Sequence, residues 1–238
     1  QLLGVLEPAD ASTPAALLGT ALLSPGSAES IRALRTNVVH IAAGTAGAGV
    51  SIVITSAKAG EGRTLTAIRL ARSLTQTGAR VLLIDADLEN QRMHEYLKLP
   101  KTAGLASVLS AGRSTVADLA HEVMAGLWVV PAGAPMDGAA ELLASQRMRD
   151  FVAAAKNAFD YVILDSPPLL DSADAAMMSE HADGVILAVR SGATTRGEIE
   201  QGLRSLDAVG ARVWGVVLCS SSLARTRRSN PPVPQPTR

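Results

Sequence analysis

The sequence predicts an α/β protein with a doubly wound, mainly parallel sheet and helices on both faces. Short apolar runs alternate with stretches of helical periodicity over most of the chain, as in proteins whose strands are buried on both faces. The 238 residues are 47% hydrophobic and only 18% charged, which excludes intrinsic disorder and suits one large core.

The expected elements follow one another in order. Residues 1–7 can form a first strand, residues 8–25 form a linker rich in Pro, Ala, Ser and Thr, and a helix begins at Ser27 or Ala28 and ends near Ala42. Further strands are expected at Ser51–Thr55, Arg80–Ile84, Leu127–Val130, Tyr161–Leu164, Gly184–Val189 and Arg212–Leu218. Further helices are expected at Arg63–Gln76, Ala139–Ala158, Ala173–His181 and Arg196–Ala208.

Charge and composition exclude several classes of function. The 22 basic residues balance 22 acidic ones, so no overall charge attracts a nucleic acid or an anionic membrane, and we expect no nucleic-acid partner. Aromatic residues make up 3% of the chain, which disfavours sites that stack bases. The single cysteine, Cys219, excludes an intramolecular disulfide and a cysteine-built zinc site, and we expect it to face the core.

A glycine-rich loop follows the strand Ser51–Thr55 and leads directly into a helix. Glycines allow backbone N–H groups to turn toward an anion, the helix N-terminus attracts negative charge, and the Thr64 hydroxyl can bind Mg²⁺. An ordinary glycine turn is the alternative. The loop has one defect, because Arg63 stands where such loops normally have lysine. The residues expected to bind the nucleotide are Lys58, Ala59, Gly60, Glu61, Gly62, Arg63, Thr64 and Leu65.

Acidic residues end two of the expected strands. Asp85 and Asp87 flank an alanine after one apolar run, and Asp165 ends another. Each acid alone can be a turn former. Together at the carboxyl edge of a parallel sheet, they supply what phosphoryl transfer needs: a Mg²⁺ site at Thr64, Asp165 and Asp85, and a carboxylate, Asp85 or Asp87, that activates the acceptor hydroxyl.

These blocks resemble the cytoplasmic domain of bacterial tyrosine kinases (BY-kinases) of capsular and exopolysaccharide synthesis, which are deviant-Walker P-loop ATPases related to MinD and ParA. The Walker A, A′ and B motifs correspond to Ala57–Thr64, Leu82–Asp87 and Val162–Pro168. The segment from Glu29 to Asn37 resembles the family's E-x-x-R-x-x-R motif. Other similar blocks are Leu127–Gly133, Ala140–Ser145 and Asp183–Arg190.

The resemblance implies a protein that binds ATP and Mg²⁺, phosphorylates tyrosines in a neighbour's tail and assembles into a ring or other homo-oligomer through Glu29, Arg32 and Arg35. It also implies a transmembrane polysaccharide chain-length regulator, fused or separate, at the cytoplasmic face of the bacterial plasma membrane. Contact with the membrane is expected only through that partner or a missing region. The alternative for this helix is a solvated face with local ion pairs.

The expected domain organisation has three parts. Residues 1–26 are an N-terminal strand and a linker from a missing upstream region, and residues 27–219 form the P-loop ATPase or kinase-like domain. Residues 220–238, rich in Ser, Arg and Pro, form a disordered tail.

Several departures from the family pattern predict weakened catalysis. Arg63 replaces lysine with a larger planar group, Glu89 stands where the family usually has arginine, and Cys219 replaces an asparagine near the adenine. The only tyrosines are Tyr96 and Tyr161, so a C-terminal tyrosine cluster is absent. Lys58 stands where MinD-like proteins have their signature lysine, which contacts phosphates across a dimer. Lys58 can therefore compensate in part for the missing Walker A lysine.

Three hypotheses remain open from the sequence. The first is a BY-kinase-type domain with weakened or altered activity. The second is a catalytically degenerate pseudokinase that acts as an oligomeric adaptor. The third is a ParA/MinD-type ATPase, in which Lys58 would contact phosphates across a nucleotide-dependent dimer.

Overall fold

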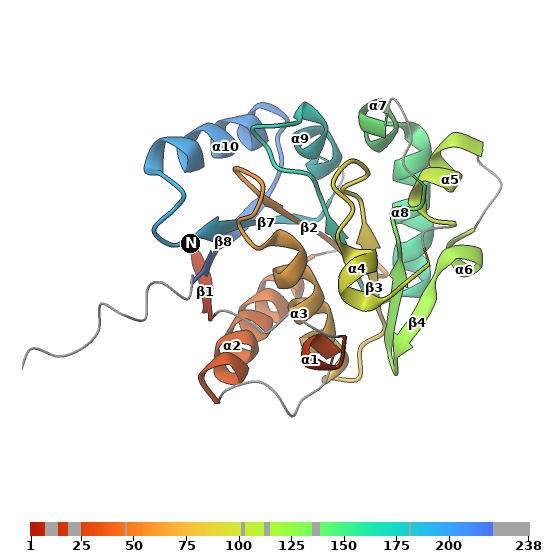
Figure 1. Ribbon diagram of the computed structural model, residues 1–238, viewed down its shortest axis with the longest axis horizontal. Coiled ribbons are helices and arrows are strands. Elements are labelled where there is room, and N and C mark those ends of the chain that lie inside the picture. Colours follow the sequence, from red (N-terminus) through yellow and green to blue (C-terminus); the bar gives the residue numbers. More distant parts are fainter. Residues whose placement is uncertain are drawn as a thin grey trace, which may run out of the picture.

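The fold is an eight-stranded sheet with helices on both of its faces, which confirms the predicted class (Figure 1). It is seen in a computed structural model that describes residues 1–7, 14–18, 25–45, 47–100, 103–111, 115–134, 139–180 and 182–220. The tail predicted to be disordered lies outside these residues except for Ser220, which donates its backbone N–H to the Leu6 carbonyl at 2.8 Å.

The strands lie in the order β1-β8-β7-β2-β6-β3-β5-β4. All neighbouring pairs are parallel except β4 and β5, which form an antiparallel hairpin at one edge. The strands are β1 (Leu2–Leu6), β2 (Val50–Ser56), β3 (Val81–Asp85), β4 (His121–Met124), β5 (Leu127–Val130), β6 (Tyr161–Asp165), β7 (Gly184–Arg190) and β8 (Val213–Cys219).

Helices connect the parallel strands, as such crossovers require. They are α1 (Pro14–Leu18), α2 (Pro25–Ala42), α3 (Arg63–Thr75), α4 (Met93–Leu97), α5 (Leu105–Ala111), α6 (Val116–Leu119), α7 (Ala139–Leu143), α8 (Gln146–Ala158), α9 (Ala173–Ser179) and α10 (Arg196–Ala208). In the part of the chain that the structure describes, none of the helices has both the length and the apolar character needed to span a membrane.

Two hydrophobic cores lie on opposite faces of the sheet. Within β2, Val53 belongs to one core, and its neighbours Ile52 and Ile54 belong to the other. Helices α8, α9 and α10 cover the first face, while α2 and α3 cover the second (Figure 1). Since both faces are covered, most positions of the central strands are apolar, and the sequence shows nearly continuous apolar runs instead of an alternation.

Residues 1–7 continue the sheet at the edge beside β8. Strand β1 runs parallel to β8, with Leu6 opposite Cys219, and the Asn37 side chain of α2 donates a hydrogen bond to the Leu3 carbonyl at 2.8 Å. The predicted first strand is therefore present and packs on the same helix as the rest of this face. The domain boundary at residue 26 stays a prediction.

Three predicted features differ from the observed fold. The first is the linker expected at residues 8–25, in which Pro14–Leu18 form helix α1 with Leu17 buried. The single helix expected at Ala139–Ala158 is two helices, because Ser145 is extended (ψ 160°) and its hydroxyl caps α8 by accepting the Met148 N–H at 3.4 Å. The region between Asp87 and Leu127, for which no elements were predicted, forms α4, α5, α6 and β4. These elements are four to seven residues long, too short to show a periodic pattern.

The tight packing of Gly184 against the Trp214 indole leads to a prediction about stability. A Cβ at Gly184 would overlap the indole ring, and Trp214 is buried, so Gly184→Ala should lower the free energy of unfolding by about 1–3 kcal/mol. Gly197→Ala is the matched control, because a Cβ there meets no atom within 4 Å and lies in α10, where alanine favours the helix. Urea unfolding of both variants measures the difference, and equal stabilities would contradict this account.

Candidate nucleotide-binding site

The phosphate loop and the acidic residues meet at the carboxyl edge of three adjacent strands. In the parallel register Ile54 of β2 lies opposite Asp165 of β6, and Asp165 lies opposite Asp85 of β3. The loop begins directly after β2 and ends at α3, so the sheet brings it beside both acids. This edge is where ligands bind in open α/β sheets.

Two glycines shape the loop. Gly60 and Gly62 have φ values of 78° and 97°, in the left-handed region that favours glycine. A Cβ on Gly62 would also come within 3.0 Å of the Cys219 sulfur. Backbone turned in this way, at the start of a thirteen-residue helix, is suited to binding an anion.

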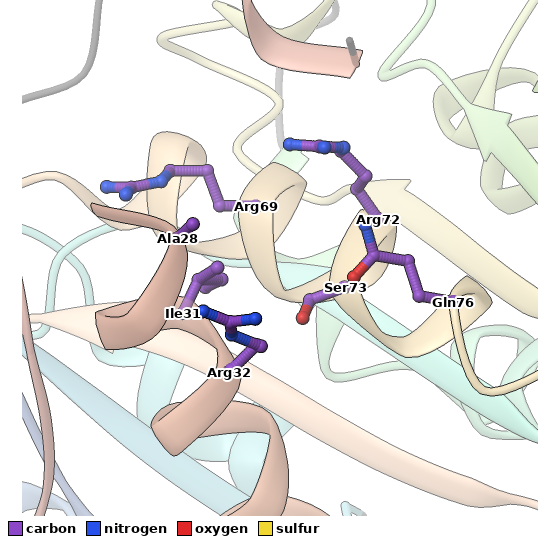
Figure 2. Close-up of a pocket in the computed structure, with 7 residues that line it drawn as sticks. All are labelled: Ala28, Ile31, Arg32, Arg69, Arg72, Ser73 and Gln76. Atoms are coloured by element: carbon purple, nitrogen blue, oxygen red, sulfur yellow. The ribbon is translucent and has the colours of Figure 1, made fainter. Parts of the chain in front are cut away.

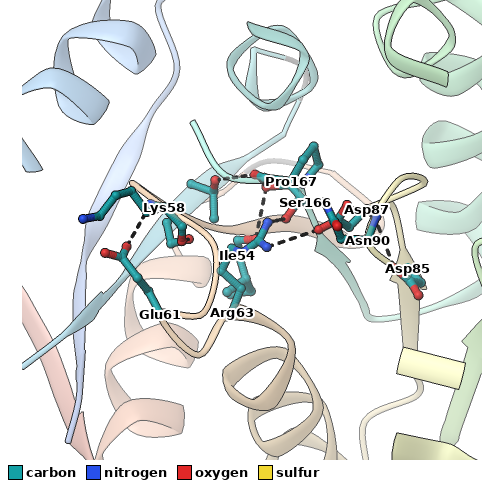
Figure 3. A network of polar contacts seen from close by, with 11 residues as sticks. Ile54, Lys58, Glu61, Arg63, Asp85, Asp87, Asn90, Ser166 and Pro167 are labelled. Carbon is teal, nitrogen blue, oxygen red and sulfur yellow. Dashed lines mark hydrogen bonds and ion pairs between the residues drawn. The ribbon is translucent and has the colours of Figure 1, made fainter. Parts of the chain in front are cut away.

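Arg63 points inward and is bound by protein groups (Figure 3). Its Nη2 contacts Asp87 Oδ2 at 3.1 Å and its Nη1 donates a hydrogen bond to the Ser166 carbonyl. The side chains of Arg63 and Asp87 are only 8% and 5% exposed. The guanidinium thus links α3 to the segments after β3 and β6, a planar two-donor contact that a lysine ammonium makes less well.

Asp165 lies behind the loop with an incomplete set of partners. The Thr64 hydroxyl is hydrogen-bonded to its carboxylate, while its Oδ1 has no hydrogen-bond partner within the described residues. Burial raises the pKa of Asp165 to about 7, an effect that the Arg63 charge and the Thr64 hydrogen bond partly oppose. A hydroxyl beside an unsatisfied carboxylate oxygen is a suitable pair of hard ligands for Mg²⁺.

Asp85 is the most deeply buried of the acids. Its Oδ1 accepts the Asp87 N–H at 3.3 Å, and its Oδ2 has no partner in the described part of the chain. Burial, together with the nearby charges of Asp165 and Asp87, raises the pKa of Asp85 well above its usual range. Among the described residues no group of three His, Cys, Asp or Glu could hold a metal ion. Mg²⁺ would therefore depend on Thr64, one or two of these carboxylates, and ligand or water oxygens.

The outer side of the loop is held by Thr194 and Glu198, which the sequence did not single out, and by Arg190, the last residue of the block Asp183–Arg190. Lys58 Nζ pairs with Glu198 at 2.6 Å, Glu61 accepts the Thr194 hydroxyl at 2.5 Å, and Arg190 donates to the Gly60 carbonyl at 3.2 Å. The Lys58 contact lowers the pKa of Glu198 to about 2 and raises that of Lys58. The only signal was the T-x-x-E pattern at Thr195–Glu198, which forms a capping box at the start of α10.

Within the loop, Ala59 is exposed, and Leu65 opens the first turn of α3 and packs against the second core. Glu61 is buried, and its second carboxylate oxygen accepts the Lys58 N–H at 3.1 Å.

The proposed oligomerisation residues divide into two groups. Glu29 and Arg32 are exposed and pair with each other at 2.7 Å, whereas Arg35 turns to α3, where it donates to the Ser73 carbonyl at 2.9 Å and to Gln76 at 3.1 Å. Arg35 therefore does not lie on the exposed surface with Glu29 and Arg32, and the oligomerisation role of all three residues stays a prediction. The Arg35 side chain is long enough to reach the neighbouring helix, which spacing along α2 does not reveal.

The residues that depart from the family pattern lie in different surroundings. Cys219 is half-buried against the loop helix, with its sulfur 3.5 Å from the Thr66 hydroxyl, and packs against the second core, in agreement with the expectation that it faces the core. Glu89 is exposed. Tyr96 lies in α4, and Tyr161 begins β6, where burial raises its pKa.

The fold and this edge define a P-loop protein, and comparisons with known proteins identify the family. Residues 49–213 match the model of the AAA domain family. The chain is 34% identical to tyrosine-protein kinase YwqD of Bacillus subtilis over 83% of its length and 82% of the relative's. It is 35% identical to tyrosine-protein kinase Wzc of Salmonella typhimurium over 81% of its length, but spans only 26% of that protein.

Solved structures agree with this assignment. The kinase domain of Escherichia coli tyrosine kinase ETK matches the whole chain, and 95% of its own, with a TM-score of 0.83 at 24% identity. A Mycobacterium smegmatis cobyrinic acid a,c-diamide synthase with bound ATP analog and magnesium shares the fold over 72% of both chains, with a TM-score of 0.61 at 22% identity. The chain belongs to the bacterial tyrosine kinase family, within the P-loop ATPases related to MinD and ParA.

The raised pKa of Asp85 predicts an unusual dependence of stability on pH. Between the unfolded pKa near 4 and the raised folded pKa, the folded chain holds a proton that the unfolded chain has lost. Each such proton makes the free energy of unfolding fall by about 1.4 kcal/mol per pH unit as pH rises. In metal-free protein, Asp85→Asn should make the fall of the free energy of unfolding with pH less steep, by about the amount that one proton contributes.

Urea unfolding between pH 5 and pH 8 in the presence of a chelator measures the two slopes. Asp150→Asn is a control on an exposed carboxylate of α8. The same slope in Asp85→Asn and in the unmodified chain would contradict the assignment.

Proposed function

We propose that this chain is an ATP-binding, tyrosine-autokinase-like P-loop protein that regulates capsular or exopolysaccharide synthesis or export, with weakened catalysis. The observation that carries the proposal is the meeting of the glycine loop, Thr64 and Asp165 at one sheet edge, with carboxylate oxygens left unsatisfied. The family to which the chain belongs supports the kinase part, and its relatives named as tyrosine-protein kinases support the substrate class.

In this proposal the backbone N–H groups from Gly60 to Leu65 bind the phosphates of ATP, with the N-terminus of α3 behind them. The Thr64 hydroxyl and the Asp165 carboxylate hold Mg²⁺, which would neutralise charge on the phosphates. Asp85 and Asp87 are the candidate bases for the acceptor hydroxyl. Asp85 Oδ2 is without a partner in the described region and has a raised pKa, as a general base requires, whereas Asp87 is already paired with Arg63.

Arg63 is the reason for expecting weak catalysis. Its guanidinium is engaged by Asp87 and Ser166, and it must leave these acceptors before it can contact a phosphate. If the altered contact loses as much transition-state stabilisation as the removal of one oxyanion-hole donor, roughly 3–4 kcal/mol, turnover falls by about 10²–10³-fold.

Assembly, partner and location form the second part of the proposal. The chain acts as a homo-oligomer through the exposed Glu29 and Arg32 and, if it leaves α3, Arg35. It works with a transmembrane chain-length regulator, fused or separate, at the cytoplasmic face of the plasma membrane. The chain's match to about a quarter of Wzc agrees with a kinase domain that is part of a longer protein in some relatives.

A pseudokinase adaptor is the second candidate, and the engagement of Arg63 by Asp87 favours it. Neither Tyr96 in α4 nor Tyr161 in β6 lies in a tail segment that a neighbour could phosphorylate. A ParA/MinD-type ATPase gains less support, because Lys58 is paired with Glu198 of the same chain.

Replacement of Arg63 by lysine separates the kinase from the pseudokinase. Arg63→Lys should raise ATP hydrolysis about 10²–10³-fold, because an ammonium can make the point contact that the guanidinium makes poorly. Phosphate release with Mg·ATP measures the rate, and Arg204→Lys, at an exposed position of α10, controls for the exchange itself. Unchanged inactivity would favour the adaptor, and no binding of the unmodified chain at millimolar Mg·ATP would exclude the enzymatic proposal.

Removal of the exposed ion pair on α2 tests the assembly proposal. The double variant Glu29→Ala, Arg32→Ala should reduce the assembly to monomers while leaving nucleotide binding unchanged, because the pair lies on the helix surface and away from the loop. Sedimentation velocity measures assembly size. The control is Arg196→Ala, Glu200→Ala, an exposed pair on α10, and equal assembly of both variants would contradict the proposal.

A further inference from the structure

A pocket of about 130 Å³ lies between α2 and α3, away from the phosphate loop (Figure 2). This volume is well above the roughly 10–15 Å³ that one water molecule needs, so a multi-atom ion can enter. Its polar lining is mostly basic and comes from both helices. The residues that line it are Ala28, Ile31, Arg32, Arg69, Arg72, Ser73 and Gln76.

Two arginines of the pocket are buried and have donors without a hydrogen-bond partner among the described residues. Arg69 and Arg72 are each only 4% exposed, yet Arg69 Nε and Nη2 and Arg72 Nε have no hydrogen-bond partner in the described residues. The buried Ser73 hydroxyl also has none. Burial lowers the pKa of both arginines, because a poorly solvated environment disfavours the charged form.

Acidic residues do not balance these charges within the part of the chain that is described. Arg69 uses one donor on the Glu7 carbonyl at 3.0 Å and feels the Glu7 charge, but no acid acts on the pKa of Arg72. Arg32, whose side chain is 54% exposed at the open side of the pocket, is paired with Glu29. A buried cation without a partner costs several kcal/mol, so a negatively charged ligand here would stabilise the fold.

We propose that this pocket is a second anion site, which binds a small phosphate-type oxyanion between Arg32, Arg69, Arg72 and Ser73. Arginine forks and a hydroxyl donor are the groups that proteins use for such ions. Figure 2 shows Arg32 reaching from α2 toward Ser73 of α3, while the side chains of Arg69 and Arg72 extend from α3 in two other directions, Arg69 past Ala28 and Arg72 away from Ser73. The site does not depend on the proposed kinase function.

The pocket and the phosphate loop share helix α3. Arg69, Arg72 and Ser73 lie on α3, the helix whose first residues are Arg63 and Thr64. The opposite wall is α2, which carries the exposed pair Glu29 and Arg32. An anion bound between these helices holds them together at a point two to three turns from the loop.

Two variants test the site without altering the loop. Arg72→Gln removes one guanidinium, and Gln76→Glu keeps the side-chain shape and its bond from Arg35 while adding a carboxylate that competes with the anion. Both should weaken the binding of inorganic phosphate by about tenfold or more, measured by isothermal titration in a buffer without other oxyanions. The control Gln201→Glu changes net charge identically on an exposed position of α10.

Crystals soaked in tungstate give the position of the ion directly. The proposal expects an anomalous peak between α2 and α3 in the unmodified chain and none there in Gln76→Glu. A peak confined to the phosphate loop, or equal phosphate affinity in the unmodified chain, Gln76→Glu and Gln201→Glu, would overturn it. Gln76→Glu is nearly isosteric and keeps the side-chain oxygen that accepts the hydrogen bond from Arg35. If Arg72→Gln fails to fold, Gln76→Glu therefore still tests the proposal.

Discussion

The parallel pairing of β2, β6 and β3 is the constraint on which the rest of this molecule depends. It aligns Ile54 with Asp165 and Asp165 with Asp85, so the ends of three strands face one edge. The loop after β2 and the acids after the other two strands are distant in sequence and become neighbours only through this register. A shift of one residue would turn each side chain to the opposite face and would separate Asp165 from Thr64.

Burial at this edge gives the site its chemical character. Asp85 and Asp165 are buried, and each has one carboxylate oxygen without a hydrogen-bond partner among the described residues. Burial raises the pKa of both groups, and the nearby charge of Asp87 adds to this effect. Arg63 supplies one positive charge against several carboxylates, which explains why its guanidinium is drawn to Asp87. The same arginine stabilises the site when it holds no ligand, because it neutralises part of this negative charge.

Helix α3 links the two regions in which charge is unevenly distributed. Its first residues belong to the phosphate loop, and its later residues line the basic pocket beside α2. Arg35 crosses from α2 to bind the Ser73 carbonyl and Gln76. The chain has 18 arginines and only four lysines. This excess has structural consequences at both ends of one helix, because guanidinium groups can bind several backbone and side-chain acceptors at once.

The sequence by itself determined the class of fold, the loop and the acids at strand ends, because apolar runs, left-handed glycines and carboxylates leave local patterns. It did not show the short elements between β3 and β5 or the break at Ser145, where a single side-chain cap decides the backbone. Only the tertiary structure decided that Arg63 binds Asp87, that Lys58 binds Glu198 and that Arg35 belongs to α3. These contacts are made by long side chains that reach from one element to another, and the spacing of residues along the sequence does not reveal which elements lie within reach.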